Sequence, residues 1–342
     1  MRVFVYEYLS SGATGERPAS LRTEGGAMLS AVLEDLSRCS SVETLALLDP
    51  CLARLADTLP PRIVPHILGT TPEEDAFRAL AASADFSLVI APEFDDILLR
   101  RCQWVESEGG RLLGPSSAAV HLTADKRILA RHWRTHGVPT PYVVDPLEPF
   151  DPILVPSPAI WKPRFGAGSQ ATFLIRDVDD IPRLEDRRRA EGWSGEMILQ
   201  AYVPGRAVSV AFLASTGALV SLPAVEQHLS TDERFHYLGG RSPLPEPLDR
   251  RARALAERAA RCVEGLHGWF GVDLVLGDTE DGSGDAVIEI NPRLTTSYVG
   301  LRRLAHFNLA ETLLAVAAGS RPLFRDWGTE PIAFRANGEI VE

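Results

Sequence analysis

The sequence predicts an α/β domain at the amino terminus followed by modules that mix helices and strands, which makes the fold class α/β plus α+β. Short β-rich runs alternate with helical patterns over the first 115 residues, as in βα units on a parallel sheet. A connector rich in proline and acidic residues follows at 145–158. At 342 residues and 45% hydrophobic content, the chain can form two or three domains with cores of their own.

The first domain is predicted to be a small doubly wound sheet. Its strands are expected at Val3–Tyr6, Glu43–Leu48, Arg62–Ile67, Phe86–Ala91 and Arg111–Leu113. Apolar residues at helical spacing predict helices over Glu24–Leu36 and Asp95–Glu106. Ligands of such sheets bind beyond the carboxyl ends of the strands, so the loop 10–12 and the helix start near Glu24 are candidate substrate walls. They are equally well explained as ordinary turn residues.

A second helix after Pro115 is predicted to begin at a Thr123 cap and to end at Gly137. Beyond the connector, the expected elements are strands at 159–163, 172–175, 197–202, 208–214, 218–225, 271–276 and 286–291, with helices at 179–191 and 248–266. The segment 229–247 is expected to be a long functional loop. The predicted domains are 1–115, 116–205 and 206–342.

Composition argues against several partners. A net charge of −11 does not suit a general nucleic-acid or anionic-membrane surface, so any bound phosphate must be held locally. We find neither a secretory leader nor an apolar run long enough to span a bilayer. The scattered cysteines indicate a reducing environment, and a cytoplasmic protein is expected.

Lysine is scarce, and both lysines lie where a phosphate could bind. Of the 35 lysines and arginines only Lys126 and Lys162 are lysines. A compact ammonium fits tightly against phosphate oxygens where a guanidinium fork would not. Lys162 precedes the glycine-rich loop Gly166–Ala171, which matches the dinucleotide-binding pattern GxGxxA. A dinucleotide site needs a helix directly after the glycines, whereas residues 172–175 are predicted to form a strand. The loop is therefore predicted to be a hairpin that folds over phosphates. The alternative for the two lysines is that they are surface residues with no role in phosphate binding.

The run VIEIN near the carboxyl end predicts a metal-binding strand. Side chains two apart on a strand share a face, so Glu289 and Asn291 should point together, and Asp273 can join them from the neighbouring strand. Two carboxylates and an amide oxygen suit magnesium. Alone, this alternation would be an ordinary half-exposed strand. The run Leu199–Val203 is apolar enough to enclose an adenine ring.

The succession DKxxxA, GVPTP, WKP, GAGS, LQAYVPG, GVDLVL and IEINPR resembles the ATP-grasp superfamily over roughly residues 110–320. The resemblance implies an ATP-grasp fold preceded by a Rossmann-like pre-ATP-grasp domain. It implies ATP and Mg²⁺ as cofactors, with Mn²⁺ as an alternative metal, and carboxylate–amine ligation through an acyl phosphate. Departures occur at Gln200, where a glutamate is frequent, and at Ala207, where many members carry a ribose-binding acid.

The resemblance assigns roles to individual residues. ATP is expected at Lys126, Lys162, Gly166, Gly168, Ser169, Gln200, Ala201 and Val203, the metal at Asp273, Glu289 and Asn291, and catalysis at Arg293 and Lys162. Substrate contacts are expected at Glu226, Tyr237, Arg241 and 295–298, including Thr295 and Thr296. Arg241 is predicted to bind a substrate carboxylate because it lies in the predicted long loop.

The segments VYEYLSSG, EGGAMLSAVLEDL and EINPRLTTSYVGLR resemble the tyramine–glutamate ligase branch of methanofuran biosynthesis. This likeness implies small-molecule substrates, L-glutamate and either tyramine or tyrosine, with a homodimer left open. Another ligase of the dipeptide-forming type and a non-catalytic ATP-binding module remain as alternatives. A dehydrogenase is disfavoured because no helix follows the glycine loop.

Overall fold

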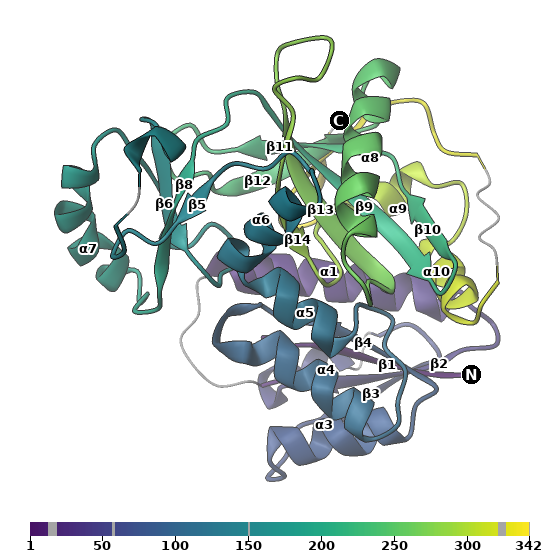
Figure 1. Ribbon diagram of the computed structural model, residues 1–342. Coiled ribbons are helices and arrows are strands. Elements are labelled where there is room, and N and C mark those ends of the chain that lie inside the picture. The colour runs from purple at the N-terminus through teal and green to yellow at the C-terminus, as the bar shows by residue number, and fades with distance from the viewer. Residues whose placement is uncertain (13–18, 57–58, 150, 321–325, 342) are drawn as a thin grey trace.

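The computed structural model describes residues 1–12, 19–56, 59–149, 151–320 and 326–341. Its described strands form three sheets that follow one another along the chain (Figure 1). Among these residues, no helix is both long and apolar enough to cross a membrane.

The amino-terminal sheet is parallel and has the strand order β3-β2-β1-β4. Its strands are β1 (Arg2–Glu7), β2 (Glu43–Leu48), β3 (Ile63–Ile67) and β4 (Phe86–Ile90), and its helices are α1 (Ala19–Ser37), α2 (Ala53–Ala56), α3 (Glu73–Ala82) and α4 (Ile97–Ser107). Near-continuous burial of β1, β2 and β4 fits a sheet covered on both faces. The expected strand at 111–113 is wrong, because only an isolated bridge joins Leu112 to Ser87.

Two consecutive helices, α5 (Ser117–Ala124) and α6 (Lys126–Thr135), lead into the second sheet. Thr123 is not the cap of α6, as the sequence suggested, but lies inside α5 and donates a hydrogen bond back to Ala119 O. Asp125 is the cap instead, and its carboxylate accepts from the amides of Arg127 and Ile128. Lys126 is thereby placed at the first position of α6.

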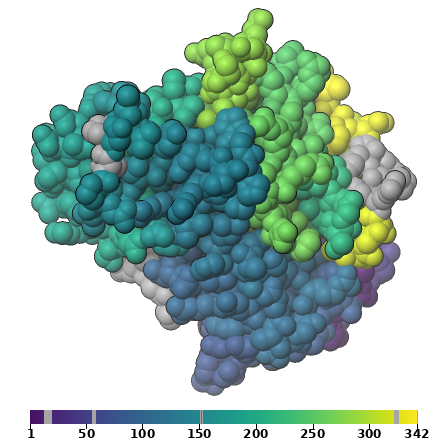
Figure 2. All heavy atoms as spheres, viewed as in Figure 1, coloured from purple at the N-terminus to yellow at the C-terminus, as the bar shows by residue number. Residues whose placement is uncertain are grey.

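The second sheet has the order β5-β8-β6-β7 and forms the teal lobe that projects from the molecule in Figure 2. It contains β5 (Val143–Val144), β6 (Ala159–Pro163), β7 (Phe173–Ile175) and β8 (Met197–Ala201), and α7 (Ile181–Ala190) packs beside them. The glycine loop is a connection between antiparallel strands, since β6 pairs with β7. This confirms that a strand, not a helix, follows the glycines.

The third sheet has the order β14-β13-β9-β11-β12-β15-β16, with β10 paired to β9. Its strands are β9 (Arg206–Ser215), β10 (Ala218–Ser221), β11 (Val225–Leu229), β12 (Tyr237–Ser242), β13 (Gly268–Leu276), β14 (Ala286–Asn291), β15 (Ile332–Arg335) and β16 (Ile340–Val341). Its helices are α8 (Glu246–Arg261), α9 (Ser297–Leu304) and α10 (Leu309–Ala317).

Two expectations for this region are wrong. The single strand expected at 218–225 is divided between β10 and β11, and the predicted long loop 229–247 contains β12. Residues 321–325 and 342 of the tail, for which the sequence suggested no role, lie outside the described residues, while 326–341 add β15 and β16.

Helix α1 joins the first and third parts of the chain, because it contacts β1 on one side and α9 and α10 on the other (Figure 1). A buried polar cluster fixes this contact: Asp35 accepts hydrogen bonds from the Tyr298 hydroxyl at 2.7 Å and from Arg302 Nε at 2.9 Å. Apolar side chains of both parts share one core around this cluster. The packing brings the carboxyl ends of β1 and β4 beside the third sheet.

Candidate active site

A cavity of about 260 Å³ lies between the second and third sheets, with α1 at one side. It is lined by residues from all three parts of the chain. Every residue expected to contact ATP, metal or the reacting groups lines it: Lys126, Lys162, Gly166, Gly168, Ser169, Gln200, Ala201, Val203, Asp273, Glu289, Asn291 and Arg293. Residues as far apart in sequence as 126 and 293 therefore meet at one surface.

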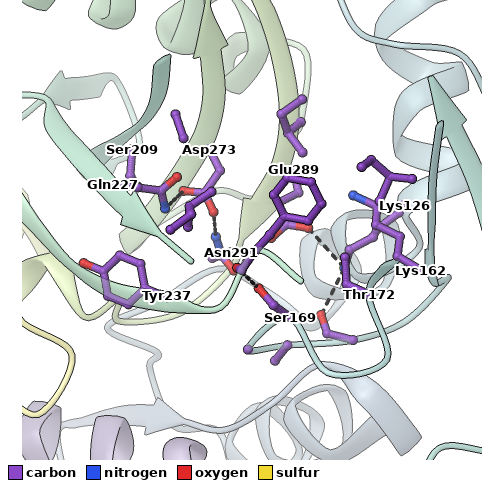
Figure 3. Close-up of a pocket in the computed structure, with 18 of the residues that line it drawn as sticks. Lys126, Lys162, Ser169, Thr172, Ser209, Gln227, Tyr237, Asp273, Glu289 and Asn291 are labelled. Atoms are coloured by element: carbon purple, nitrogen blue, oxygen red, sulfur yellow. Dashed lines mark hydrogen bonds and ion pairs between the residues drawn. The ribbon is translucent and has the colours of Figure 1, made fainter. Parts of the chain in front are cut away.

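The two lysines approach this cavity from different elements. The amide of Lys126 donates to Arg164 O, and Asp125 forms an ion pair with the Arg164 side chain at 2.5 Å, which ties the start of α6 to the end of β6. Lys126 Nζ then lies 3.0 Å from Gly166 O and 3.2 Å from Glu289 Oε2 (Figure 3). Two ammonium groups at one wall create a local positive site in an acidic protein.

Lys162 is the more buried lysine, with 7% of its surface exposed. Desolvation, together with repulsion from Lys126, lowers the pKa of Lys162 to about 8, although Glu289 acts in the opposite direction. An ammonium in such a place gains from an added anion more than a solvated lysine would.

The expected metal ligands meet across the β13–β14 pair. Asp273 lies directly opposite Glu289, and Asn291 Nδ2 donates to Asp273 Oδ2 at 2.9 Å (Figure 3). Desolvation and the neighbouring Glu289 raise the pKa of Asp273 to about 6. Desolvation would also raise the pKa of Glu289, but Lys126 and Lys162 outweigh it and lower that pKa.

This donor set fits a divalent cation. Two carboxylates that face each other in a desolvated cleft repel, and a hard cation between oxygen donors relieves that repulsion. Within the described ranges, no three His, Cys, Asp or Glu side chains form a metal cluster. The two carboxylates and one amide are therefore a partial shell, which suits a magnesium ion that is also bound by phosphate oxygens.

The glycine hairpin forms one lip of the cavity. Gly168 has a φ of +67°, in the region that favours glycine, and Ser169 Oγ donates to Phe235 O at 2.7 Å. The hairpin thus rests on the β11–β12 connection, a contact that the sequence did not suggest.

The apolar end of the cavity is formed by β8 and the residues after it. Gln200, Ala201 and Val203 line it together with Ala207. Gln200 is 3% exposed, and among the described residues its Nε2 has no hydrogen-bond partner. An amide donor without a partner, next to an apolar cleft, can donate a hydrogen bond to the polar edge of a planar ring.

The substrate residues expected from sequence divide into two groups. Tyr237, Thr295 and Thr296 line the cavity, whereas Glu226 and Arg241 do not. Arg241 lies on β12 opposite Glu226, whose carboxylate forms an ion pair with Arg206 at 2.7 Å. A β-bulge at His228 and Leu229 changes the alternation, so Tyr237 faces the cavity while Arg241 is exposed on the other face. Tyr298, at the end of the 295–298 run, is buried in the core.

Sequence reasoning missed several residues of the site. Glu93, just after β4, lies with its Oε1 3.0 Å from Arg293 Nε. Gln227 donates to Asp273 at 3.3 Å, and Ser209 lines the cavity beside it. Glu24, which the sequence suggested only as a candidate wall of a substrate site, accepts a hydrogen bond from the Thr296 hydroxyl at 3.1 Å. The position of Glu93 just after the carboxyl end of β4, and of Glu24 in the helix that follows β1, was the available signal.

Comparison with known proteins agrees with this geometry. A model of the ATP-grasp domain matches residues 123–297, and a model of the pre ATP-grasp 3 domain matches residues 42–120. The chain belongs to the ATP-grasp family. The ATP-grasp fold and the leading pre-ATP-grasp domain expected from sequence are confirmed.

A curated relative, the tyramine–L-glutamate ligase of Methanocaldococcus fervens, is 26% identical over 72% of this chain and 70% of its own length. The crystal structure of an ATP-grasp superfamily protein from Archaeoglobus fulgidus superposes with a TM-score of 0.73 at 24% identity, covering 98% of this chain and 92% of that one. The crystal structure of an N5-carboxyaminoimidazole ribonucleotide synthetase in complex with ADP superposes with a TM-score of 0.71 at 18% identity. The match covers 97% of this chain and 80% of that one. The two structural matches show the fold. The family match and the ligase relative confirm the predicted enzyme class, an ATP-dependent ligase that forms carbon–nitrogen bonds.

Proposed function

We propose that this protein joins a carboxylate of L-glutamate to tyramine or tyrosine, using ATP and passing through an acyl phosphate. The observation that supports it most is the convergence of Lys126, Lys162, Arg293 and the Asp273–Glu289 pair on one cavity. The curated relative named tyramine–L-glutamate ligase supports the substrate assignment.

In the proposed reaction, an oxygen of the glutamate carboxylate attacks the γ-phosphorus of ATP and ADP leaves. The amine nitrogen then attacks the acyl carbon, phosphate leaves, and a proton is lost from nitrogen. Both steps develop or transfer negative charge on phosphoryl oxygens, so the enzyme's contribution is positioning and electrostatic stabilisation.

Each group of side chains has a proposed role in this scheme. Lys126 and Lys162 bind the phosphates, and Arg293, held in orientation by Glu93, stabilises the acyl phosphate. Gly166, Gly168 and Ser169 cover the phosphates and exclude water from the anhydride. Gln200, Ala201 and Val203 contact adenine.

Asp273, Glu289 and Asn291 would hold Mg²⁺, which when bound supplies charge neutralisation at the β- and γ-phosphates. We also propose the division into domains 1–115, 116–205 and 206–342, since β1–β4, β5–β8 and β9–β16 fall in these ranges. For the substrates, Tyr237, Thr295 and Thr296 remain proposed contacts, while Arg241 is withdrawn because it is exposed away from the cavity.

ADP release tests the function directly. The protein is incubated with Mg-ATP and L-glutamate, with and without tyramine or tyrosine, and product is identified by mass spectrometry. Amide formation that requires all components, and that falls at least 100-fold in Lys162→Arg and Glu289→Gln, is expected. ATP binding without turnover in any mixture would favour the non-catalytic module.

A further inference from the structure

A second cavity opens next to the main one, at the carboxyl ends of β1 and β4; we call it the sheet-end pocket. It shares Glu24, Ala167, Gly168 and Arg293 with the main cavity, so the two are continuous at these residues. Its other lining residues include Glu7, Tyr8, Leu21, Gly25, Met28 and Phe94.

The walls of this pocket are largely apolar. Tyr8, Met28 and Phe94 are 6%, 5% and 2% exposed, so they are held firmly by the core behind them. On α1, residues 21, 24, 25 and 28 follow helical spacing and present one face to the pocket. Gly25 allows α1 to approach, because a Cβ there would lie 2.4 Å from Glu7 Oε1. Such walls suit a ring or another compact apolar group.

The polar groups of the pocket are mostly engaged within the protein. Both oxygens of Glu7 accept hydrogen bonds, from the amides of Leu9 and Ser10 and from the Ser10 hydroxyl. Arg293 is paired with Glu93. Glu24 has only the Thr296 hydroxyl as a hydrogen-bond partner among the described residues, and it stands at the junction of the two cavities.

These charges discriminate between ligands. Among the described residues, two carboxylates and one already paired guanidinium line the pocket, so a ligand ammonium at Glu24 gains a partner. A ligand carboxylate would instead lie among like charges in a poorly solvated site. Arg22 lies near Glu7 but is exposed and does not line the pocket. Desolvation raises the pKa of Glu24, although the Thr296 hydroxyl and the charge of Arg293 act in the opposite direction.

We propose that the sheet-end pocket binds the apolar body of the amine substrate, that Glu24 binds its ammonium, and that the site therefore selects an aromatic amine without an α-carboxylate, tyramine over tyrosine. The inference rests on the proposed function, because the amine must reach an acyl phosphate formed in the adjoining cavity. Glu24 lines both cavities, which places an amine bound to it next to the reacting groups.

A panel of nucleophiles tests the selectivity. With saturating Mg-ATP and L-glutamate, kcat/KM is measured for tyramine, 2-phenylethylamine, tyrosine and ethanolamine. Tyrosine and ethanolamine are each expected to fall roughly 10- to 100-fold below tyramine, the first through its carboxylate and the second through its missing ring. In addition, 4-ethylphenol should inhibit competitively against tyramine and not against ATP. Equal use of tyrosine and tyramine would overturn the proposal.

Two variants test the residues. Glu24→Gln and Leu21→Ala should each raise the tyramine KM about tenfold or more, with matched controls Glu74→Gln and Leu147→Ala, both exposed and distant, behaving as wild type. Acyl phosphate is trapped in parallel with hydroxylamine, which is too small to need the pocket, and the ratio of amide to hydroxamate should fall at least tenfold in both variants.

The trapping assay distinguishes a failure of the proposed function from a failure of the Glu24 assignment. If wild-type protein forms no hydroxamate from L-glutamate and ATP, the proposed function is wrong. If hydroxamate forms but Glu24→Gln raises the glutamate KM instead of the tyramine KM, Glu24 belongs to the carboxylate substrate and the present inference is wrong.

Discussion

Replacing Lys162 by methionine is expected to stabilise the nucleotide-free protein while it abolishes activity. The pKa of Lys162 is about 8 in the folded protein, against an ordinary value of 10.5. A lowered lysine pKa means that folding disfavours the ammonium, and this cost is complete below pH 8 and disappears as pH rises from 8 to 10.5. At about 1.36 kcal/mol per unit, the cost at pH 7 is about 3 kcal/mol.

Methionine removes this cost, which already includes the attraction between Lys162 and Glu289. Imperfect packing of the new side chain offsets part of the gain, so a net gain of about 1 to 2 kcal/mol is expected. With an unfolding entropy of about 2.1 cal/mol/K per residue, that corresponds to a rise in Tm of roughly 1 to 3 °C. Amide formation should fall about 10²- to 10³-fold, because a cation aimed at the transferring phosphoryl group is lost.

The assay is thermal unfolding in EDTA without nucleotide, at pH 7 and again at pH 10, where the gain should shrink to below about 1 kcal/mol. Lys126→Met is the matched control: it removes the contacts to Glu289 and Gly166 O, and it should lower the Tm. A Tm loss in Lys162→Met equal to that in Lys126→Met would refute the reasoning.

Three further predictions concern other contacts. Glu289→Gln removes one carboxylate of the proposed metal pair, and the Mg²⁺ concentration for half-maximal activity should rise about 10- to 100-fold in a titration at fixed ATP. Gly168→Ala should lower kcat roughly tenfold, because an added Cβ would lie 2.6 Å from Leu21 Cδ2 at a φ of +67°; Gly192→Ala, with a φ of +75° and open space, should leave kcat unchanged. Arg302→Met removes the buried guanidinium that pairs with Asp35 and, among the described residues, leaves only the more exposed Arg38, at 3.5 Å, as a cation there. It should cost about 3 kcal/mol in urea unfolding, whereas Arg250→Met, whose side chain is 73% exposed, should cost less than about 1 kcal/mol.

Local patterns in the sequence predicted several of the residues that line the candidate site. The alternation in VIEIN predicted that Glu289 and Asn291 share a face, and both side chains line the cavity. The β-branched and aromatic run after the glycines predicted the strand β7 and ruled out a dinucleotide helix. Each of these patterns depends only on the geometry of a few consecutive residues.

The orientation of Arg241 could not be predicted from a local pattern. Its glycine-flanked segment lacks a clear strand pattern, yet it pairs with both β11 and β15 and forms part of the third sheet. One β-bulge then decides which side chains face the cavity. The cap of α6 was misplaced for a similar reason, since Thr123 and Asp125 are both good capping residues and only the bend at Asp125 distinguishes them.

The sequence by itself determined most of the order of elements, the two lysines, the glycine hairpin and the carboxylate strand, because helix and strand periodicity and turn chemistry act over short stretches. Only the tertiary structure decided that Glu93 pairs with Arg293 and that Glu24 meets Thr296, contacts separated by 200 and 272 residues. Those contacts exist because α1 packs between the first sheet and helices α9 and α10, burying an apolar core that no local pattern specifies. The sheet-end pocket is a product of the same packing.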